Sequence, residues 1–484
     1  MELEDIINQR VNKIKALRSK GTDPYPRKFA YSSSIGKALA DFAEGKSVSL
    51  AGRLIAKRAH GKASFGNIQD QSGKIQLYVQ EDVLGKDKFD FFADLDIGDF
   101  VGVKGELFKT RTGEQTVKVT EIDLLSKALK PLPEKWHGLK DIEIRYRKRY
   151  LDLIANKQVK DIFQIRSKVI GGIRKFLDDR DYLEVETPML QPIPGGAAGR
   201  PFKSFHNESD MDVYLRIAPE LYLKRLLVGG FDKIYEINRS FRNEGISTRH
   251  NPEFTMLEVY TAYADYEDVM NLTENLISSL AKEIKGSLTI EYQGKTIDLT
   301  PPWQRRSFAK VVKEMFDINP DDEASQMVKK LKLKKPALDI KDKFTRSQVM
   351  KIVEDLLQED TVSKPVFFID YFSSLSPLSK TRSDNPLLAE RFELFLGGME
   401  VANAYSELND PQEQRQRLED EIASQDNPDI KKIDEDFLDA LEYGMPPAGG
   451  LGVGIDRLVM LFTDQSSIRD VIFFPLLKYK EKDE

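Results

Sequence analysis

The chain has 484 residues, of which 40% are hydrophobic and 31% charged, with no cysteine, four histidines and a formal net charge of −6 at pH 7. Without cysteine, disulfides, thiolate zinc sites and thiol nucleophiles are excluded, and a metal would need carboxylates or histidines, which favours Mg²⁺. No apolar run approaches the roughly 20 residues of a membrane span, and the start MELEDIINQR lacks a signal-peptide core. We therefore expect a cytosolic (cytoplasmic) protein of two or more domains without membrane contact.

Charge is distributed unevenly along the chain. Residues 1–150 carry 28 Lys and Arg against 21 Asp and Glu, a net charge of +7, which leaves −13 for the remainder. This asymmetry is expected when one domain meets phosphates, so the N-terminal part is the candidate nucleic-acid binder.

Residues 1–45 begin with apolar positions near helical spacing, which predicts an amphipathic helix over 1–20, ended by Gly21 and the turn TDPYP. Its basic residues fit either a solvated face or one that contacts RNA.

Residues 46–130 change to short alternating runs punctuated by glycine. The pattern predicts five strands and a helical segment at Phe89–Leu95, a small closed barrel of the OB type. Such barrels stack bases on aromatic rings and follow the nucleic-acid backbone with basic residues. Phe65 could instead be a ring of the barrel core. The candidates for binding are Arg53, Lys57, Arg58, Phe65, Gln76 and Tyr78.

A proline-containing linker is expected at 131–150, followed by a second domain at 151–484. An apolar stripe predicts a helix around 169–177 that leads into the strand YLEVETPML, and this helix could face a core or a partner. The Gly-rich loop IPGGAAGRPF lacks a P-loop lysine, which excludes a phosphate cradle of the Walker kind. Glu220 is placed in the first turn of the next helix.

Residues 233–262 read as two antiparallel strands joined by a polar loop. The guanidinium of Arg242 could form a bidentate hydrogen bond to an α-phosphate, and Phe254 could stack a base. Arg249 and His250 could hold the outer phosphates. A solvated hairpin with cross-strand ion pairs is the alternative. The charged stretch 316–364 predicts a helical insertion, to which we assign no chemistry.

Residues 391–410 predict a tight hairpin around Gly397 and Gly398. Glu393 and Glu400 near its turn could hold Mg²⁺ against triphosphate oxygens, although solvated acids would look the same. Glu400 is out of phase by one residue with Asn403, Tyr405 and Glu407, so a β-bulge is required for all four to face one site.

The segment FRNEG followed by RHNPEFTMLE resembles motif 2 of the class II aminoacyl-tRNA synthetases, most closely the lysyl-tRNA synthetases. Residues 169–188 are similar to motif 1, GLGVGIDR within 446–461 to motif 3, and RAHGKASFGNIQDQSGKIQLYV to the family's anticodon-binding barrel. The class I signatures HIGH and KMSKS are missing. The resemblance implies an α+β protein, with an OB-fold barrel and a class II antiparallel-sheet catalytic domain with flanking helices, and a two-fold homodimer.

The resemblance also implies roles for individual residues. Arg242 and Arg457 would be catalytic, Glu393 and Glu400 would hold Mg²⁺, and Arg58, Phe65 and Gln76 would read a uridine-rich anticodon. The implied ATP-binding residues are Arg242, Glu244, Arg249, His250, Asn251, Phe254, Gly454 and Arg457. The implied lysine-binding residues are Gly196, Glu220, Glu258, Tyr260, Asn403, Tyr405 and Glu407.

Charge decides between amino acids, because an ammonium side chain needs unpaired acids whereas aspartate needs cations. Glu220, Glu258 and Glu407 supply acids, so we predict a lysine–tRNA ligase that uses ATP, L-lysine and tRNA(Lys), and not DNA. Three alternatives stay open: an aspartyl or asparaginyl enzyme, an RNA-binding regulatory protein on a synthetase scaffold, and a relative that lysylates a protein.

Overall fold

The computed structural model describes residues 2–133, 139–197, 199–357, 361, 363–424 and 432–478. The chain forms two compact units, Met1–Asp141 and Ile142–Glu484. Within the described ranges, no helix is long and apolar enough to cross a membrane.

The predicted linker at 131–150 is longer than the structure allows. Residues 134–138 lie outside the described part, but α5 (Ile142–Arg147) and α6 (Arg149–Ala155) already belong to the second unit. Arg149 explains why, because its buried guanidinium pairs with Asp152 at 2.7 Å and donates to the carbonyl of Phe473 at 3.0 Å. A buried arginine needs such partners, so these residues fold with the second unit.

The first unit is the predicted barrel, preceded by α1 (Leu3–Ser19) and α2 (Ile35–Ala40). Five strands close in the order β1-β2-β3-β5-β4. The helices α3 (Glu81–Leu84) and α4 (Lys86–Asp94) lie between the third and fourth strands. The strands are β1 (Ser47–His60), β2 (Ala63–Gln69), β3 (Lys74–Gln80), β4 (Phe100–Lys109) and β5 (Gln115–Ser126).

Alternation along β2 and β3 separates the barrel core from its outer face. Ile68 and Leu77 are buried in the core, whereas Phe65, Gln76 and Tyr78 are half-buried on the other face. Phe65 is therefore not a ring of the barrel core. It lies on the accessible face, where the predicted contact with nucleic acid is still possible.

The second unit is organised around an eight-stranded sheet in the order β14-β15-β16-β17-β18-β11-β10-β6. Neighbours are antiparallel except at the two edges, where β14 and β15 and also β10 and β6 run parallel. The strands are β6 (Leu183–Glu184), β10 (Lys233–Phe241), β11 (Glu253–Ala262), β14 (Gln304–Ser307), β15 (Val366–Phe372), β16 (Leu388–Leu396), β17 (Met399–Ser406) and β18 (Ala448–Gly454).

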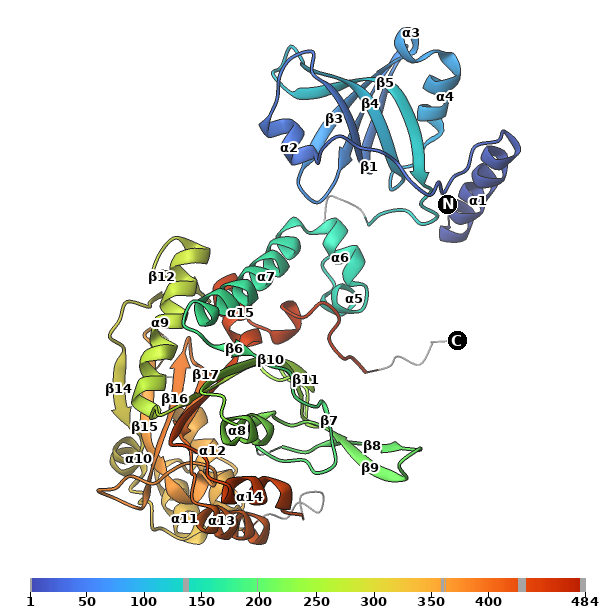
Figure 1. Ribbon diagram of the computed structural model, residues 1–484. Helices are drawn as coiled ribbons and strands as arrows, with labels where there is room; N and C mark the ends of the chain where they lie inside the picture. Colours follow the sequence, from blue (N-terminus) through green and yellow to red (C-terminus); the bar gives the residue numbers. More distant parts are fainter. Residues whose placement is uncertain are drawn as a thin grey trace. The chain divides into compact units, whose positions relative to one another are not determined.

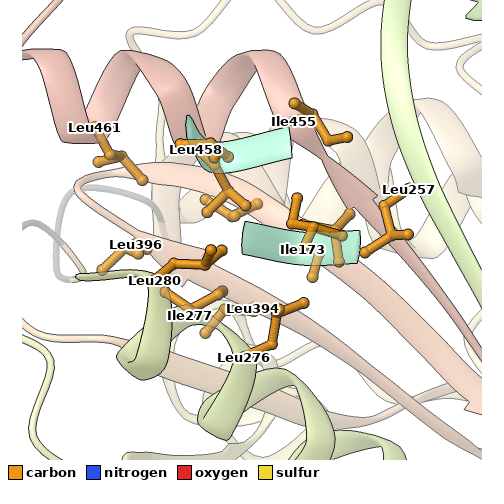
Figure 2. Packing of buried hydrophobic residues seen from close by; sticks show 14 of the residues in the cluster. Ile173, Leu257, Leu276, Ile277, Leu280, Leu394, Leu396, Ile455, Leu458 and Leu461 are labelled. Atoms are coloured by element: carbon orange, nitrogen blue, oxygen red, sulfur yellow. The ribbon is translucent and has the colours of Figure 1, made fainter. Parts of the chain in front are cut away.

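One face of this sheet is covered by α7 (Lys157–Asp178), α9 (Tyr266–Lys285) and α15 (Ile455–Thr463) (Figure 1). Figure 2 shows how leucine and isoleucine side chains from these helices meet Leu257 and Leu394 of the sheet. This apolar layer is the main core of the unit, so polar chemistry has to lie elsewhere.

The opposite face carries α8 (Glu220–Val228) and α14 (Glu435–Glu442), with α13 (Pro411–Ser424) beside them. Successive side chains of a strand point to opposite faces. On β11, Leu257 and Val259 belong to the main core, while Tyr260 packs in the cluster of α8 and α14. Glu258 is in phase with Tyr260 and so points to this second face.

The remaining elements surround the sheet. The predicted insertion is helical, and α10 (Phe308–Phe316), α11 (Ala324–Lys334) and α12 (Arg346–Leu357) share a third core with β15. β12 (Thr289–Tyr292) and β13 (Lys295–Asp298) form a short antiparallel hairpin. Figure 1 shows β8 and β9 reaching away from the sheet. They form a ribbon with β7, and the bounds are β7 (Leu190–Gln191), β8 (Phe202–His206) and β9 (Met211–Leu215).

Candidate active site

A cavity of about 1710 Å³ opens on the sheet face that carries Glu258 and Tyr260. Its lining contains every residue of the second domain that the sequence singled out for ATP, metal or amino acid binding. They come from nine separate elements and loops, so the fold brings them together. These residues are Gly196, Glu220, Arg242, Glu244, Arg249, His250, Asn251, Phe254, Glu258, Tyr260, Glu393, Glu400, Asn403, Tyr405, Glu407, Gly454 and Arg457.

Arg242 directly follows β10, where its backbone N–H donates to the carbonyl of Pro252 at 2.9 Å. Its guanidinium carbon lies 5.2 Å from the centre of the Phe254 ring. Burial lowers the pKa of Arg242, and its Nε is a buried donor without a hydrogen-bond partner among the described residues. A buried donor of this kind suits an anionic ligand.

Two glycines, Gly199 beside Arg242 and Gly454 beside Arg457, differ in how strictly the fold requires glycine. A Cβ on Gly199 would lie 3.2 Å from Cγ and Cδ of Arg242, so glycine leaves room for this side chain. A Cβ on Gly454 would meet only an ordinary contact, 3.6 Å to Cδ of Arg457. The fold therefore does not itself require glycine at 454, which fits a role in admitting a ligand.

The loop between β10 and β11 turns sharply at Ser247, whose N–H donates to the carbonyl of His250 at 3.0 Å and whose Oγ lies 2.9 Å from Nδ1 of His250. This turn places Nε2 of His250 3.5 Å from Nη2 of Arg457. Desolvation and the Arg457 cation lower the pKa of His250. The ring therefore stays neutral at pH 7 beside a cation, which suits a shared anionic ligand.

Arg457 is fixed in place by its neighbour Asp456 in the first turn of α15. The Asp456 carboxylate pairs with Arg166 of α7 at 2.5 Å and accepts a hydrogen bond from the N–H of Thr255 at 2.7 Å. An acid in the first helical turn is also favoured by the helix dipole. These contacts tie the start of α15 to β11, so Arg457 and Phe254 face the same cavity.

The β16–β17 hairpin contains the predicted β-bulge. Leu394 pairs with Ala402 and Phe395 pairs with Glu400, so Val401 is the extra residue. The bulge restores the phase. As a result Glu400, Asn403 and Tyr405 are all half-buried and line the cavity, while Val401 and Ala402 are buried in the main core.

Glu393 and Glu400 lie near the hairpin turn but are not bare acids. Glu393 accepts from the Tyr371 hydroxyl at 3.0 Å and pairs with Arg391, while Glu400 lies 3.2 Å from Arg457. Burial, opposed by Arg391 and assisted by Glu400, raises the pKa of Glu393 to about 7. Within the described residues, no group of three or more His, Asp or Glu side chains forms a metal cage. Two hard oxygen donors nevertheless fit Mg²⁺, which usually keeps waters and phosphate oxygens as further ligands.

The glutamates predicted to bind the amino acid lie in one half of the cavity and are deeply buried. The Tyr405 hydroxyl donates to Oε1 of Glu220 at 2.6 Å, and the Tyr260 hydroxyl donates to Oε2 of Glu258 at 3.3 Å. Burial raises the pKa of Glu258 well above its usual value, with a further contribution from Glu220. Buried carboxyls that are costly to ionise gain from a cationic ligand.

Glycines also shape this half of the cavity. A Cβ on Gly450 of β18 would lie 1.8 Å from Oε1 of Glu407, so only glycine admits that carboxylate. Gly196 has a φ of +84° and a Cβ there would lie 3.2 Å from Cβ of Glu220. Both positions therefore need glycine for steric reasons beside an acid of the cavity.

The expectation of unpaired acids is wrong for two of the three glutamates. Lys224 of α8 is fully buried, and its Nζ lies 2.8 Å from Glu220 and 2.5 Å from Glu407. The pairing of Lys224 with Glu220 could have been expected from the sequence, because the two residues stand four positions apart on one helix face. The pairing with Glu407 depends on the packing of α8 against the end of β17, which the sequence does not show.

The cavity also contains residues that the sequence patterns did not single out. Arg391 donates from Nε to Oδ1 of Asn403 at 3.1 Å. The insertion, to which we assigned no chemistry, contributes Lys351 and Glu354 of α12 to the lining. Burial and the neighbouring Glu393 raise the pKa of Glu354 well above its usual value. The interpretation of the insertion as chemically silent is therefore incomplete.

The three anticodon candidates lie on β1, β2 and β3 of the barrel. Arg58 is opposite Phe65 in the strand register, and the Phe65 ring lies 4.9 Å from the Tyr78 ring. Gln76 donates to Glu114 at 2.9 Å and accepts from Thr116 at 2.9 Å. This face therefore offers a cation, two neighbouring rings tilted by 32° to each other, and an oriented amide.

Two other barrel candidates, Arg53 and Lys57, have structural partners instead. Lys57 donates to the carbonyl of Leu95 at 2.6 Å, next to the C-terminal end of α4, where a cation is favoured. Arg53 donates to the carbonyl of Gly98 at 2.9 Å. Both cations therefore hold the segment after α4 and are poor candidates for contacting nucleic acid.

Comparison with known families finds two matches along the chain. Residues 141–478 match the family described as tRNA synthetases class II (D, K and N), and residues 48–125 match the OB-fold nucleic acid binding domain. The first match covers well over half of the chain.

Curated relatives resemble the chain over its whole length. A protein from Carboxydothermus hydrogenoformans named lysine–tRNA ligase is 51% identical over 484 residues, which covers 99% of each chain. Relatives with the same name from Pelotomaculum thermopropionicum and Moorella thermoacetica are 51% and 49% identical, and cover 99% and 100% of this chain and 96% and 100% of their own.

Proposed function

The chain belongs to the class II tRNA synthetases of the D, K and N group and acts as an ATP-dependent lysine–tRNA ligase, and on this premise we propose how its residues divide the reaction. The lysine carboxylate attacks the α-phosphorus of ATP and yields lysyl-adenylate and pyrophosphate. The lysyl group then passes to the 3′ terminal adenosine of tRNA(Lys), and AMP leaves. No protein nucleophile is needed, so catalysis consists of alignment and of charge neutralisation on the phosphates.

We propose that Arg242 bridges the lysine carboxylate and the α-phosphate. Its buried, unpartnered Nε and its position beside Phe254 support this role. Phe254 and the guanidinium plane of Arg457 would sandwich the adenine, while Arg457 and His250 hold the pyrophosphate. The further ATP contacts that we propose are Glu244, Arg249, Asn251 and Gly454.

We propose that Glu393 and Glu400 hold Mg²⁺. Their carboxylate oxygens face the same cavity as the three residues Arg242, His250 and Arg457 that are proposed for phosphate binding, which supports the assignment. When bound, the ion would offset negative charge on the triphosphate. The chain's own contribution is to fix both carboxylates, through Tyr371 and Arg391 on one and Arg457 on the other.

We propose that Glu407 and Tyr260 contact the ε-ammonium of lysine and that Glu220 and Glu258 hold its α-amino group. Gly196, Asn403 and Tyr405 would complete the wall. The observation that carries this assignment is the presence of three buried carboxylates, Glu220, Glu258 and Glu407, in one cavity. An aspartate or asparagine side chain would bring no cation to offset them, which disfavours those substrates.

For tRNA, we propose that Arg58, Phe65 and Gln76 read the anticodon by stacking and hydrogen bonding. We also propose a two-fold homodimer through the motif 1 region of α7 and β6, and the cytosol as the compartment where ATP and tRNA are met. The intact barrel supports tRNA as the acceptor and disfavours a protein-lysylating relative. The presence of Arg242, Glu393, Glu400 and Arg457 disfavours a regulatory protein without activity.

The experiment that tests the amino acid assignment is exchange of pyrophosphate into ATP without tRNA, with lysine, aspartate, asparagine or no amino acid. We expect exchange with lysine alone. A Glu407→Gln variant is expected to raise the KM for lysine, with Glu419→Gln on the exposed part of α13 as a matched control. Exchange driven by aspartate or asparagine, or no exchange with any of them, would contradict the proposed pocket.

A further inference from the structure

Lys224 is a buried lysine whose ammonium lies between two carboxylates of the cavity. It stands one helical turn after Glu220 on α8, and its Nζ is 2.8 Å from Oε1 of Glu220 and 2.5 Å from Oε2 of Glu407. The side chain has no exposed surface. Because a buried ammonium is stable only with such compensation, Lys224 and the two acids form one unit.

Other groups face this unit from two strands. Tyr405 of β17 has its ring centre 5.5 Å from Nζ of Lys224, and its hydroxyl donates to the same Glu220 oxygen that Lys224 contacts. Glu258 and Tyr260 face it from β11. Within the described residues, Lys224 is the one cation that forms an ion pair with Glu220 or Glu407.

Counting these charges gives a simple balance. With all groups ionised, Glu220, Glu258 and Glu407 supply three negative charges and Lys224 one positive charge, so the pocket offers two net negative charges. Free L-lysine brings two ammonium groups, and its carboxylate is directed to Arg242 in the function proposed above. Without Lys224, three buried acids would face two ammonium groups, and a proton would have to make up the difference.

We propose that Lys224 is a positioning residue of the amino acid site, which holds Glu220 and Glu407 side by side and weakens proton binding there, so that the ammonium groups of L-lysine bind instead. This inference rests on the proposed lysine site. It assigns Lys224 no contact with the substrate. The residue acts through the two carboxylates that would make those contacts.

The proposal predicts competition between substrate and proton at Glu407. Burial raises the pKa of Glu407 to about 8, and Lys224 opposes that rise. Below this pKa a proton has to leave before an ammonium can pair with the carboxylate. The KM for lysine should therefore rise as the pH falls below about 8, by up to tenfold for each pH unit. Removing Lys224 should move the pH at which KM levels off to a higher value.

The experiment measures KM and kcat for lysine in pyrophosphate exchange from about pH 6 to 8.5, and each KM is expressed as the concentration of lysine whose α-amino group is protonated at that pH. It compares the unchanged chain with Lys224→Met, Lys224→Gln and Lys224→Arg, and thermal melting verifies that each variant folds. At pH 7 we expect the Met and Gln variants to raise KM about tenfold or more, with a smaller change in kcat. Their KM should still be falling at pH 8.5.

A matched control is Lys127→Met in the barrel unit. Lys127 is also a buried lysine between two carboxylates, Asp96 and Asp99, with the latter at 2.8 Å. Its loss is expected to destabilise the barrel and to leave the pH profile of KM for lysine unchanged. Lys224→Arg keeps a cation, and we expect its KM to level off at nearly the same pH as in the unchanged chain.

The outcomes separate this inference from the proposed function. If the unchanged chain exchanges pyrophosphate with an amino acid other than lysine, the proposed function is wrong. If lysine drives exchange but the Met and Gln profiles run parallel to that of the unchanged chain, only the inference on Lys224 is overturned. If neither variant folds, Lys224→Arg decides, since a profile displaced despite the retained cation would refute the charge argument and a retained profile would support it.

Discussion

Arg457 contacts Glu400 twice, because its Nη1 donates to the backbone carbonyl of Glu400 at 2.5 Å and lies 3.2 Å from the carboxylate of the same residue. A residue proposed for the outer phosphates thus lies against a residue proposed for Mg²⁺. The backbone contact survives a change of the Glu400 side chain, so the two roles can be separated by mutation.

Glu400→Gln is expected to keep the fold and to lower pyrophosphate exchange by about 100-fold, because a neutral amide cannot replace a charged oxygen ligand. The Mg²⁺ concentration that gives half-maximal exchange should also rise. Glu291→Gln serves as the control, since Glu291 is exposed on the β12–β13 hairpin. An unchanged Mg²⁺ requirement in Glu400→Gln would refute the metal assignment.

Arg242→Lys keeps the charge but removes the planar fork that can bridge a carboxylate and a phosphate. We expect exchange to fall by about 100-fold, while equilibrium binding of lysine changes by only a few fold. Arg239→Lys is the matched control on β10, the strand that Arg242 follows, because Arg239 is exposed and lies 3.7 Å from Glu253. Near-normal exchange in Arg242→Lys would show that the residue supplies charge alone.

Glu258→Gln tests how much the buried acid lowers the free energy of unfolding. Burial raises the pKa of Glu258 in the folded state, so above the ordinary value of 4.5 the folded chain holds a proton that the unfolded chain has released. The free energy of unfolding should therefore fall as the pH rises above that value, and the glutamine should remove this loss. We expect Glu258→Gln to raise the melting temperature at about pH 8 and to raise the KM for lysine.

The control for this pair of effects is Glu253→Gln, which changes an exposed acid on the same strand. It should leave both the melting temperature and the KM nearly unchanged. The melting temperature of Glu258→Gln minus that of the unchanged chain should be more positive at pH 8 than at pH 5. A difference that is more negative at pH 8 would contradict the sign of the effect.

Phe65→Ala removes the half-buried ring whose centre lies 4.9 Å from that of Tyr78 in the barrel. Stacking of a base on such a ring contributes about 1–3 kcal/mol, so kcat/KM for tRNA aminoacylation should fall between about 5-fold and 150-fold. Exchange without tRNA should be unaffected. Tyr31→Ala, at a ring that is 64% exposed elsewhere in the same unit, should alter neither activity. Equal losses in both assays would show a folding defect and not an anticodon contact.

Local pattern was sufficient for much of the fold. Alternation, helical spacing and glycine positions predicted the barrel, the helix over 1–20, and the hairpin around Gly397 and Gly398, because each depends on residues close in sequence. The one-residue phase error at Glu400 even predicted the bulge at Val401. Features set by short-range geometry can be read from a sequence in this way.

Contacts between residues far apart in the sequence could not be predicted in the same way. The pairing of Lys224 with Glu407 joins residues 183 positions apart, and no local period encodes it. The same holds for Lys351 and Glu354, which reach the cavity only because α12 packs beside β15. Lys57 looked like a nucleic-acid contact because its charge is visible in the sequence, whereas its carbonyl partners after α4 are not.

The bulge at Val401 places a residue proposed for Mg²⁺ and two residues proposed for lysine on one continuous strand. Glu400 lies before it, and Asn403 and Tyr405 follow it on the same rigid backbone. The separation between nucleotide and amino acid is then set by covalent geometry and sheet hydrogen bonds, and no hinge between subdomains is needed to align them. Deleting the single residue Val401 would turn one side of the site inward, so this strand should tolerate changes of length far less well than changes of composition.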